Sequence, residues 1–288
     1  MKSQAYKFSP AYREFILKIL KSNSLKIVSS HESYITGLDD ELESLKPNLN
    51  RRRTNKIFTD IHDSEALPHE LGHAVDFWFG ENQSLTKTVV IEDGKTLYDI
   101  FTQEFLEKKE QLYQIVMDEY RQIINSNINK DAFYILMSNI DLYRRLLKLP
   151  VNEENRKERK RIQKTLYQNG FVEVYYQTLT KKCYSILNKK YSPILDALSS
   201  QYDFDGLFLD HHEASYYKSS KYKAVYEFFA NVFADKVTSN HVHFDNLIKY
   251  LPQSFKAFEK LFVIFYDHLQ NNKRFTDVPV VKEIRYEL

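Results

Sequence analysis

Apolar side chains recur at the spacing of an α-helix over most of this chain. In residues 10–22 they stand at Tyr12, Phe15, Ile16 and Ile19, the i, i+3, i+4, i+7 pattern that places them on one helix face. The same spacing predicts further helices at residues 97–126, 130–148, 152–168, 171–190, 220–237 and 252–271, with a shorter one at 39–45.

A small antiparallel sheet is expected beside these helices. The strand candidates are residues 24–30, 56–61 and 86–91, and Asp93-Gly94 is the turn signal of a hairpin. Glycine (6) and proline (7) are scarce, while Tyr (21) and Phe (20) are abundant, which disfavours an all-β protein with many tight turns. The predicted fold class is therefore α+β, predominantly α.

Charge and cysteine content exclude several classes of protein. The 41 basic and 39 acidic residues leave a net charge of +2, so no nucleic-acid partner is expected. Residues 153–164 are almost entirely charged or polar, and the preferred interpretation is a solvated helix or hinge rather than a binding patch. The single cysteine, Cys183, excludes an internal disulfide and a cysteine-ligated zinc site.

Targeting signals are not evident in the sequence. No apolar run is long enough for a membrane span, and Arg13, Glu14 and Lys18 interrupt the N-terminal apolar stretch, so we expect neither membrane association nor a signal peptide. The expected location is the cytoplasm, and export by a route that needs no cleaved signal stays open.

One predicted helix has clear boundaries. Ser64 is a candidate N-cap, Pro68 suits the first turn, and the helix is expected to run to Phe79 and stop at Gly80. Its first half reads HELGH over residues 69–73. This segment is where we expect the chemistry of the protein.

The spacing of the two histidines in this helix indicates a metal site. His69 and His73 are four residues apart, so both project from one face and can bind one Zn²⁺. Glu70 lies one step round the helix, where it can hold a metal-bound water rather than the metal. Gly72 costs about 1 kcal/mol of helix propensity, which suggests that another backbone packs against it.

The third ligand must come from elsewhere, and Glu227 is our first choice. It lies in residues 222–234, a segment rich in aromatic and small residues that should be buried on most sides. A carboxylate in such a place is costly unless it is paired or coordinates a metal. The alternative role is an ion pair with a buried Arg or Lys. Glu213, in a loop beside His211 and His212, is the competing ligand.

Two segments resemble known metallopeptidases. HELGHAVD (residues 69–76) and YEFFANVFAD (226–235) are similar to the zincins with a glutamate third ligand, namely the lethal-factor-type proteases and the Pro-Pro endopeptidases. HEASYYK (212–218) and YLPQSF (250–255) also resemble the zincin-like domain of phage and mobile-element proteins. The likeness covers about residues 60–80 and 192–270.

The resemblance implies a single zincin-like domain over residues 1–288, with a minimal core, two active-site helices and a large helical insertion at residues 97–191. In the toxin-type proteases a tyrosine seven residues before the glutamate ligand helps to stabilise the oxyanion, and here that position holds Ser220. Tyr216, Tyr217, Tyr222 and His212 are the substitutes, and the sequence does not choose among them.

The expected reaction is hydrolysis of a peptide bond in a protein or peptide substrate. His69, His73 and Glu227 would hold Zn²⁺, and Glu70 would take a proton from the metal-activated water.

The histidine ligands need acceptors for their remaining ring N–H groups. Asp76, Asn231 and Asp235 are the candidates, although Asp76 could equally be a solvated carboxylate.

Two other functions stay open. The chain could be a non-catalytic, zinc-stabilised accessory or binding protein of a phage or mobile element, or a toxin or effector protease that acts on one host protein. Glu70 favours catalysis over the first of these, because a purely structural zinc site has no use for it.

Overall fold

The computed structural model describes residues 9–22, 26–29, 34–35, 56–59, 66–78, 84–127, 130–150, 152–175, 185–202, 216–217, 220–239 and 242–270. The chain divides into two compact units, the first formed by residues 1–108 with 219–288 and the second by residues 109–218. The predicted fold class is confirmed, because helices dominate the described residues and the strands are few and short.

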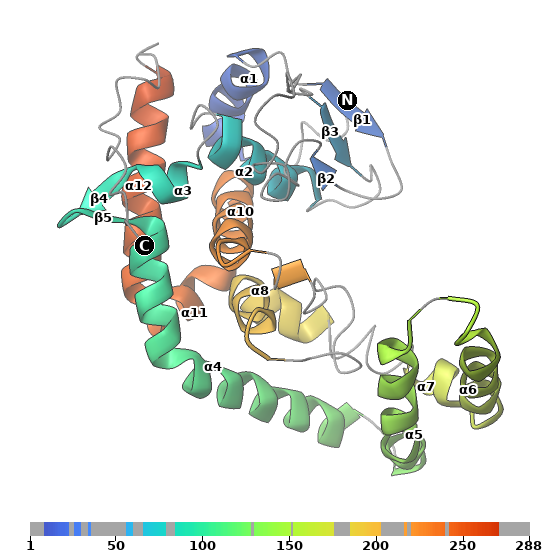
Figure 1. The fold of residues 1–288 in the computed structure, drawn as a ribbon. Coiled ribbons are helices and arrows are strands. Elements are labelled where there is room, and N and C mark those ends of the chain that lie inside the picture. Colours follow the sequence, from blue (N-terminus) through green and yellow to red (C-terminus); the bar gives the residue numbers. More distant parts are fainter. Residues whose placement is uncertain are drawn as a thin grey trace, which may run out of the picture. The chain divides into compact units, whose positions relative to one another are not determined.

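Helices and two small sheets make up the first unit (Figure 1). Its elements are η1 (Pro10–Tyr12), α1 (Arg13–Ser22), β1 (Lys26–Ser29), β2 (Tyr34–Ile35), β3 (Lys56–Thr59), α2 (Ala66–Trp78), α3 (Leu85–Thr88), β4 (Val90–Glu92), β5 (Lys95–Thr96), the first part of α4 (Leu97–Asn127), α10 (Lys223–Thr238), α11 (Val242–Tyr250) and α12 (Pro252–Gln270).

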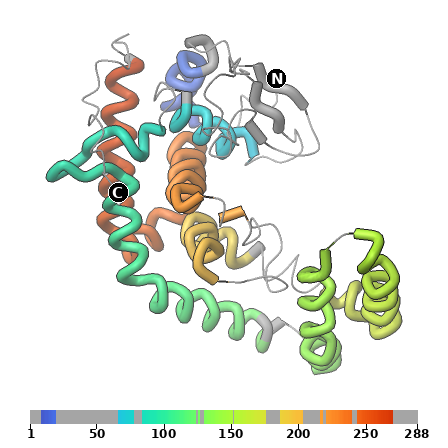
Figure 2. Tube along the Cα trace, in the orientation of Figure 1, coloured from blue at the N-terminus to red at the C-terminus, as the bar shows by residue number. Residues whose placement is uncertain are grey.

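Helices α2 and α10 form the centre of this unit. They are far apart in the sequence and lie against each other (Figure 2). Around them, the aromatic residues of α10 and α12 interlock: Phe229 lies 5.5 Å from Phe258 and Phe233 lies 6.0 Å from Phe262, measured between ring centroids. Burial of these rings is the main favourable contribution to folding here, and it holds α10 in place against α12.

The larger sheet differs from the prediction in its strands and in one strand pair. β2 was not predicted, and the third predicted strand, residues 86–91, contributes instead to the separate β4-β5 sheet. Its order is β1-β3-β2, with β2 antiparallel to β3 but β1 parallel to β3, and α2 contacts β2 and β3. Residues 24–30 and 56–61 were the right strands. A parallel pair needs a long connection between its strands, and residues 30–55 are long enough to supply one.

The predicted hairpin exists, but its first strand starts later than expected. β4 and β5 pair in antiparallel fashion around Asp93-Gly94, whose φ angles of 51° and 75° suit a tight two-residue turn. The prediction of a strand from residue 86 is wrong, because residues 85–88 form α3. Hydrogen bonds from Thr86 to Asp76 hold this short helix against α2, and no local pattern reports such a contact.

Gly72 brings α2 and α10 closer than any other residue would allow. A Cβ atom at this position would lie 2.7 Å from the Cα atom and 3.0 Å from the carbonyl oxygen of Ala230. Both atoms belong to backbone, so the contact cannot be relieved by a side-chain rotation. The packing reason expected for this glycine is therefore present.

Gly72→Ala is expected to lower the free energy of unfolding by up to about 2 kcal/mol. Overpacking costs about 1–3 kcal/mol, and the better helix propensity of alanine returns about 1 kcal/mol. Urea unfolding followed by circular dichroism measures the difference. Adding Ala230→Gly should not restore stability, because the atoms that clash are backbone atoms. Full rescue by that second change would contradict this account of the contact.

The second unit is helical in its described part. Beyond the rest of α4 it contains α5 (Lys130–Lys148), α6 (Arg156–Gln168), α7 (Phe171–Tyr175) and α8 (Ser185–Ser199). The helices α5, α6 and α7 pack on one another, with Tyr143 5.2 Å from Phe171 and 4.7 Å from Tyr175 between ring centroids.

Two predicted helices in this unit have different bounds. α6 starts at Arg156 instead of 152, after a turn over residues 153–155. The predicted helix 171–190 is two helices in the structure, and the second runs on to Ser199 through Pro193. The short helix expected at 39–45 lies outside the described residues.

Candidate metal centre

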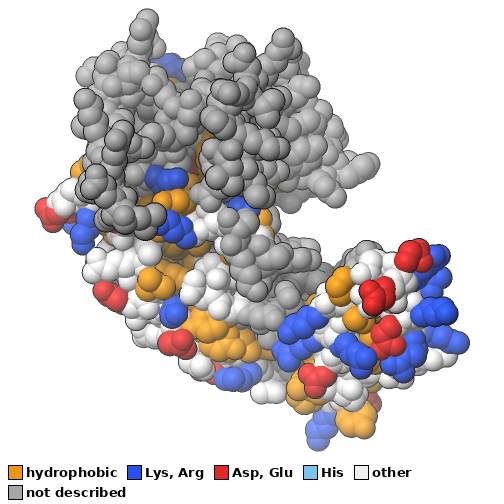
Figure 3. Space-filling view, in the orientation of Figure 1, with side chains coloured by type: hydrophobic (Ala, Val, Ile, Leu, Met, Phe, Trp, Pro, Cys, Tyr) orange, Lys and Arg blue, Asp and Glu red, His pale blue; other side chains and the backbone are white. Residues whose placement is uncertain are grey.

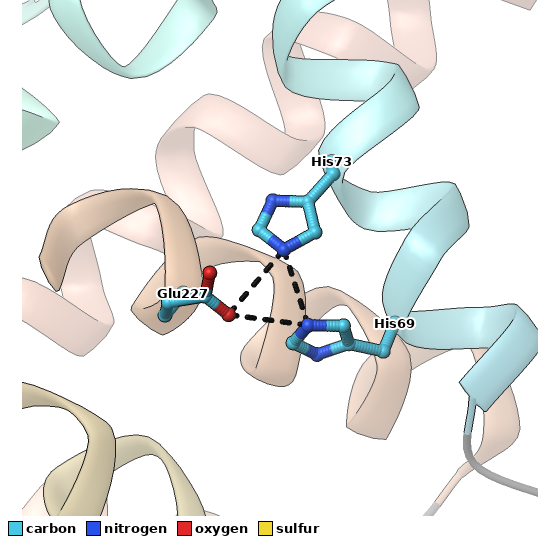
Figure 4. Close-up of side chains that lie close together, drawn as sticks. All are labelled: His69, His73 and Glu227. Carbon is cyan, nitrogen blue, oxygen red and sulfur yellow. Dashed lines mark hydrogen bonds and ion pairs between the residues drawn. The ribbon is translucent and has the colours of Figure 1, made fainter. Parts of the chain in front are cut away.

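Three side chains from α2 and α10 point toward one another (Figure 4). The Nε2 atoms of His69 and His73 are 3.1 Å apart. The Oε2 atom of Glu227 lies 3.2 Å from the first and 3.4 Å from the second. The helical spacing of four residues brings the two rings together, with centroids 4.7 Å apart and planes at 85°, and the close packing at Gly72 brings α10 near enough for Glu227 to reach both.

The spacing of these three atoms fits a tetrahedral zinc ion. A tetrahedron with metal–ligand bonds of about 2.0–2.1 Å has edges of about 3.3–3.4 Å. The separations of 3.1, 3.2 and 3.4 Å are close to that length. Two imidazoles and one carboxylate are also a ligand set of catalytic zinc sites, which keep a fourth position for water.

A divalent cation would compensate the buried charge of Glu227. Glu227 is only 1% exposed, and His73 is 6% exposed. A charge held away from water is costly unless another charge or several hydrogen bonds compensate it. Neutral imidazoles offer no full charge, whereas a divalent cation between the three groups would supply it.

Asn231 orients the ring of His69. Its Oδ1 atom lies 3.0 Å from Nδ1 of His69, so it accepts a hydrogen bond when Nδ1 carries the proton. This tautomer leaves the lone pair of Nε2 directed at His73 and Glu227, as metal binding requires. Asn231 is one helical turn from Glu227, and one face of α10 therefore carries both groups.

Asp76 contacts α3 rather than a histidine. One of its carboxylate oxygens accepts the backbone N–H of Thr86 at 2.8 Å, and the other accepts the Thr86 hydroxyl at 3.0 Å. Nδ1 of His73 is buried and has no hydrogen-bond partner among the described residues. Asp76 is fully buried, and it ties α2 to α3 just beyond the histidines. The alternative of a solvated carboxylate is wrong.

Burial raises the pKa of Asp76 from 3.8 to about 6, and the hydrogen bonds from Thr86 limit the rise. The folded protein therefore holds a proton that the unfolded chain has released between about pH 4 and pH 6. Stability falls with rising pH wherever the folded state binds more protons. In the metal-free protein, Asp76 should thus favour folding most at acid pH, and the benefit should be lost as the pH passes 6.

Asp76→Asn is expected to remove this part of the pH dependence. Between pH 4 and pH 7 the wild type should lose about 1–3 kcal/mol of unfolding free energy relative to the variant, since one pKa unit corresponds to about 1.4 kcal/mol. Urea unfolding of both metal-free proteins at several pH values gives the difference directly. Parallel curves over this range would show that Asp76 does not titrate as described.

Glu70 lies next to His69 on α2 and is 7% exposed. It is a buried acid on the helix that carries both histidines, and it is distinct from the three converging groups.

The candidate oxyanion donors lie in different parts of the chain. Tyr222 immediately precedes α10, where its ring lies 4.6 Å from that of Tyr98 and 3.7 Å from the ammonium of Lys87. Tyr216 and Tyr217 belong to the second unit, where the Tyr217 hydroxyl donates a hydrogen bond to Asp196 at 3.1 Å.

His212 and the competing ligand Glu213 lie outside the described residues. Ser220, at the position where the similar toxin proteases have tyrosine, is buried, and its hydroxyl accepts the backbone N–H of Tyr222 at 3.2 Å.

Sequence reasoning missed two buried polar arrangements in the first unit. Asp235, expected near a metal-binding histidine, instead lies 2.6 Å from Nδ1 of His243 on α11. Glu104 of α4 accepts the backbone N–H of Ser254 at 2.7 Å and caps the start of α12. Each pair joins separate helices, so no spacing in the sequence reports it.

Comparison with protein-family models, curated proteins and solved structures found no match for this chain. Among the described residues, no helix combines the length and the apolar character needed to cross a membrane.

Proposed function

We propose that this protein is a zinc-dependent endopeptidase. The observation that carries the proposal is the triangle of His69 Nε2, His73 Nε2 and Glu227 Oε2, whose sides of 3.1, 3.2 and 3.4 Å suit one tetrahedral ion. Glu70 directly follows His69 on α2 and is buried, and it is an acid that a purely structural zinc site would not need.

Each residue has a separate task in this proposal. His69, His73 and Glu227 hold the ion, and Asn231 keeps the ring of His69 in the binding tautomer. When bound, zinc lowers the pKa of a water molecule toward about 7 and polarises the carbonyl group of the substrate. Glu70 accepts the proton of the attacking water and donates it to the leaving amine. Tyr222, which immediately precedes α10 in the same unit, is the candidate donor to the oxyanion.

The sheet next to α2 offers a way to hold an extended substrate. β2 is at the edge of the β1-β3-β2 sheet and contacts α2. An edge strand has unpaired backbone groups that can bind a peptide as a further strand. Such backbone pairing would position a protein or peptide without requiring a particular residue, and the restricted specificity would come from side-chain contacts.

Metal analysis and peptide cleavage test the proposal together. Purified protein should contain about one zinc ion per chain, the His69→Ala/His73→Ala variant should contain none, and a peptide library should be cleaved by the wild type only. Removing zinc with a chelator should stop cleavage, and adding zinc should restore it. Wild-type protein that takes up no zinc would refute the proposal. Zinc uptake without cleavage of any peptide would favour a non-catalytic zinc-stabilised protein.

A further inference from the structure

A row of exposed lysines runs along α6 in the second unit. Lys157, Lys160 and Lys164 follow the i, i+3, i+7 spacing, and Tyr167 continues the row three residues later. At about 100° per residue these four side chains fall within an arc of about 80°. All four are exposed, and Tyr167 is 77% exposed, an unusual place for a large aromatic ring. We call these four residues the lysine row.

The other basic residues around α6 have partners. Arg156 pairs with Glu153 at 3.0 Å, and Arg161 and Arg145 share Glu158 at 2.8 and 3.0 Å. Arg159 donates hydrogen bonds to two carbonyl groups at the end of α5, those of Leu146 and Leu149. Among the described residues, no ion pair or hydrogen bond involves the side chains of Lys157, Lys160 and Lys164. Glu153 and Glu158 thus pair with arginines, and no ion pair within the described part of the chain neutralises the lysine row.

The opposite face of α6 packs against neighbouring helices of the same unit. Ile162 and Leu166 are buried, and α6 packs on α5 and α7 through this side. An amphipathic helix binds a membrane surface by inserting its apolar face, and α6 has no apolar face left to insert. The row therefore suits a ligand that meets charges and one aromatic ring at the surface.

We propose that the lysine row binds the backbone of a single-stranded nucleic acid and that Tyr167 stacks on one of its bases. Surfaces of this class combine a line of positive charge with aromatic side chains, and they need no particular base sequence. Lys and Arg side chains gather on the surface formed by α5, α6 and α7 (Figure 3). The near-neutral net charge of +2 led us to expect no nucleic-acid partner. The net charge, however, does not show which basic side chains are neutralised by ion pairs and which are not. This function is separate from the proposed peptidase site.

Fluorescence anisotropy with the full chain and a labelled oligonucleotide of twelve thymidines tests the proposal. Contact with three phosphates predicts a slope of about −2 for the logarithm of the binding constant against that of the salt concentration, since each contact on single strands contributes about −0.7. Binding should therefore weaken by about tenfold between 50 and 150 mM NaCl. Lys157→Gln/Lys160→Gln/Lys164→Gln should abolish most of the salt dependence and weaken binding by at least tenfold at 50 mM. Tyr167→Ala should weaken it by about fivefold or more without changing the slope.

The matched control removes three paired charges from the same region: Arg156 and Arg161, described above, and Arg144, which lies 3.7 Å from Asp141. Arg144→Gln/Arg156→Gln/Arg161→Gln changes the net charge equally and should weaken binding by less than about threefold. Equal losses in both triple variants would overturn the proposal, because binding would then follow total charge. Absence of binding by the wild type at 50 mM NaCl would overturn it too. Binding to vesicles that contain phosphatidylserine, or to polyglutamate, would also overturn the proposal if it equalled binding to the oligonucleotide in strength and in its dependence on Tyr167. Circular dichroism verifies that each variant is folded.

Discussion

Replacing Glu70 by glutamine should reduce peptide cleavage by about 10²–10⁴-fold, the usual contribution of a positioned general base. Glutamine has nearly the same shape but cannot accept and return a proton. Since His69, His73 and Glu227 form the converging group without Glu70, the zinc content should remain about one per chain. The combination of lost activity and retained zinc is what distinguishes a proton-transfer role from a ligand role.

Glu107→Gln is the matched control for this experiment. Glu107 is an exposed glutamate on α4, where it accepts a hydrogen bond from Gln103, and the substitution makes the same chemical change away from the metal centre. It should leave the cleavage rate within about twofold of the wild type. A Glu70→Gln protein that cleaves as fast as this control would exclude Glu70 as the base.

The parts of the site that lie within one helix were predictable from the sequence. The spacing of His69 and His73 and the position of Glu70 follow from helical geometry alone. Gly72 could be interpreted because a glycine in a helix needs a compensating reason, and the backbone of Ala230 supplies it. Glu227 was chosen because a carboxylate in an otherwise apolar helix needs a partner, and it lies beside both histidines.

Contacts between separate elements were less predictable. Asp76 was expected to serve a histidine, but the N-terminal turn of α3 offers it two donors from Thr86. The parallel pairing of β1 with β3 depends on the path of the chain between them, which periodicity does not describe. On α10, Asn231 lies within hydrogen-bonding distance of His69, as expected from the sequence, whereas Asp235 lies against His243. Asn231 is a single turn from Glu227 and is therefore on the same face of the helix.

Glu227→Gln should weaken zinc binding by more than about 100-fold. Losing a group that merely orients a metal ligand costs about 10–100-fold in affinity, and Glu227 would be a ligand itself and the only one of the three with a formal negative charge. Wild-type protein at a zinc concentration of 100 times the dissociation constant gains about 2.7 kcal/mol of stability. The variant at the same concentration should gain about 0.4 kcal/mol or less, so that its melting temperature hardly responds to zinc.

The metal-free forms should behave in the opposite way. Without a cation, the carboxylate of Glu227 is a buried charge at 1% exposure, and replacing it with a neutral amide removes a cost of desolvation. Metal-free Glu227→Gln should therefore melt at or above the temperature of the metal-free wild type. Calorimetry with and without zinc measures both effects on the same two proteins.

Glu104→Gln is the control for burial. Glu104 is also 1% exposed, but it caps α12 through Ser254 and takes no part in the converging group. Its replacement should lower the melting temperature with and without zinc by the same amount, because the lost hydrogen bonds do not depend on the metal. If Glu227→Gln followed this pattern, with a zinc response equal to that of the wild type, Glu227 would be a structural acid and the third ligand would have to be sought elsewhere.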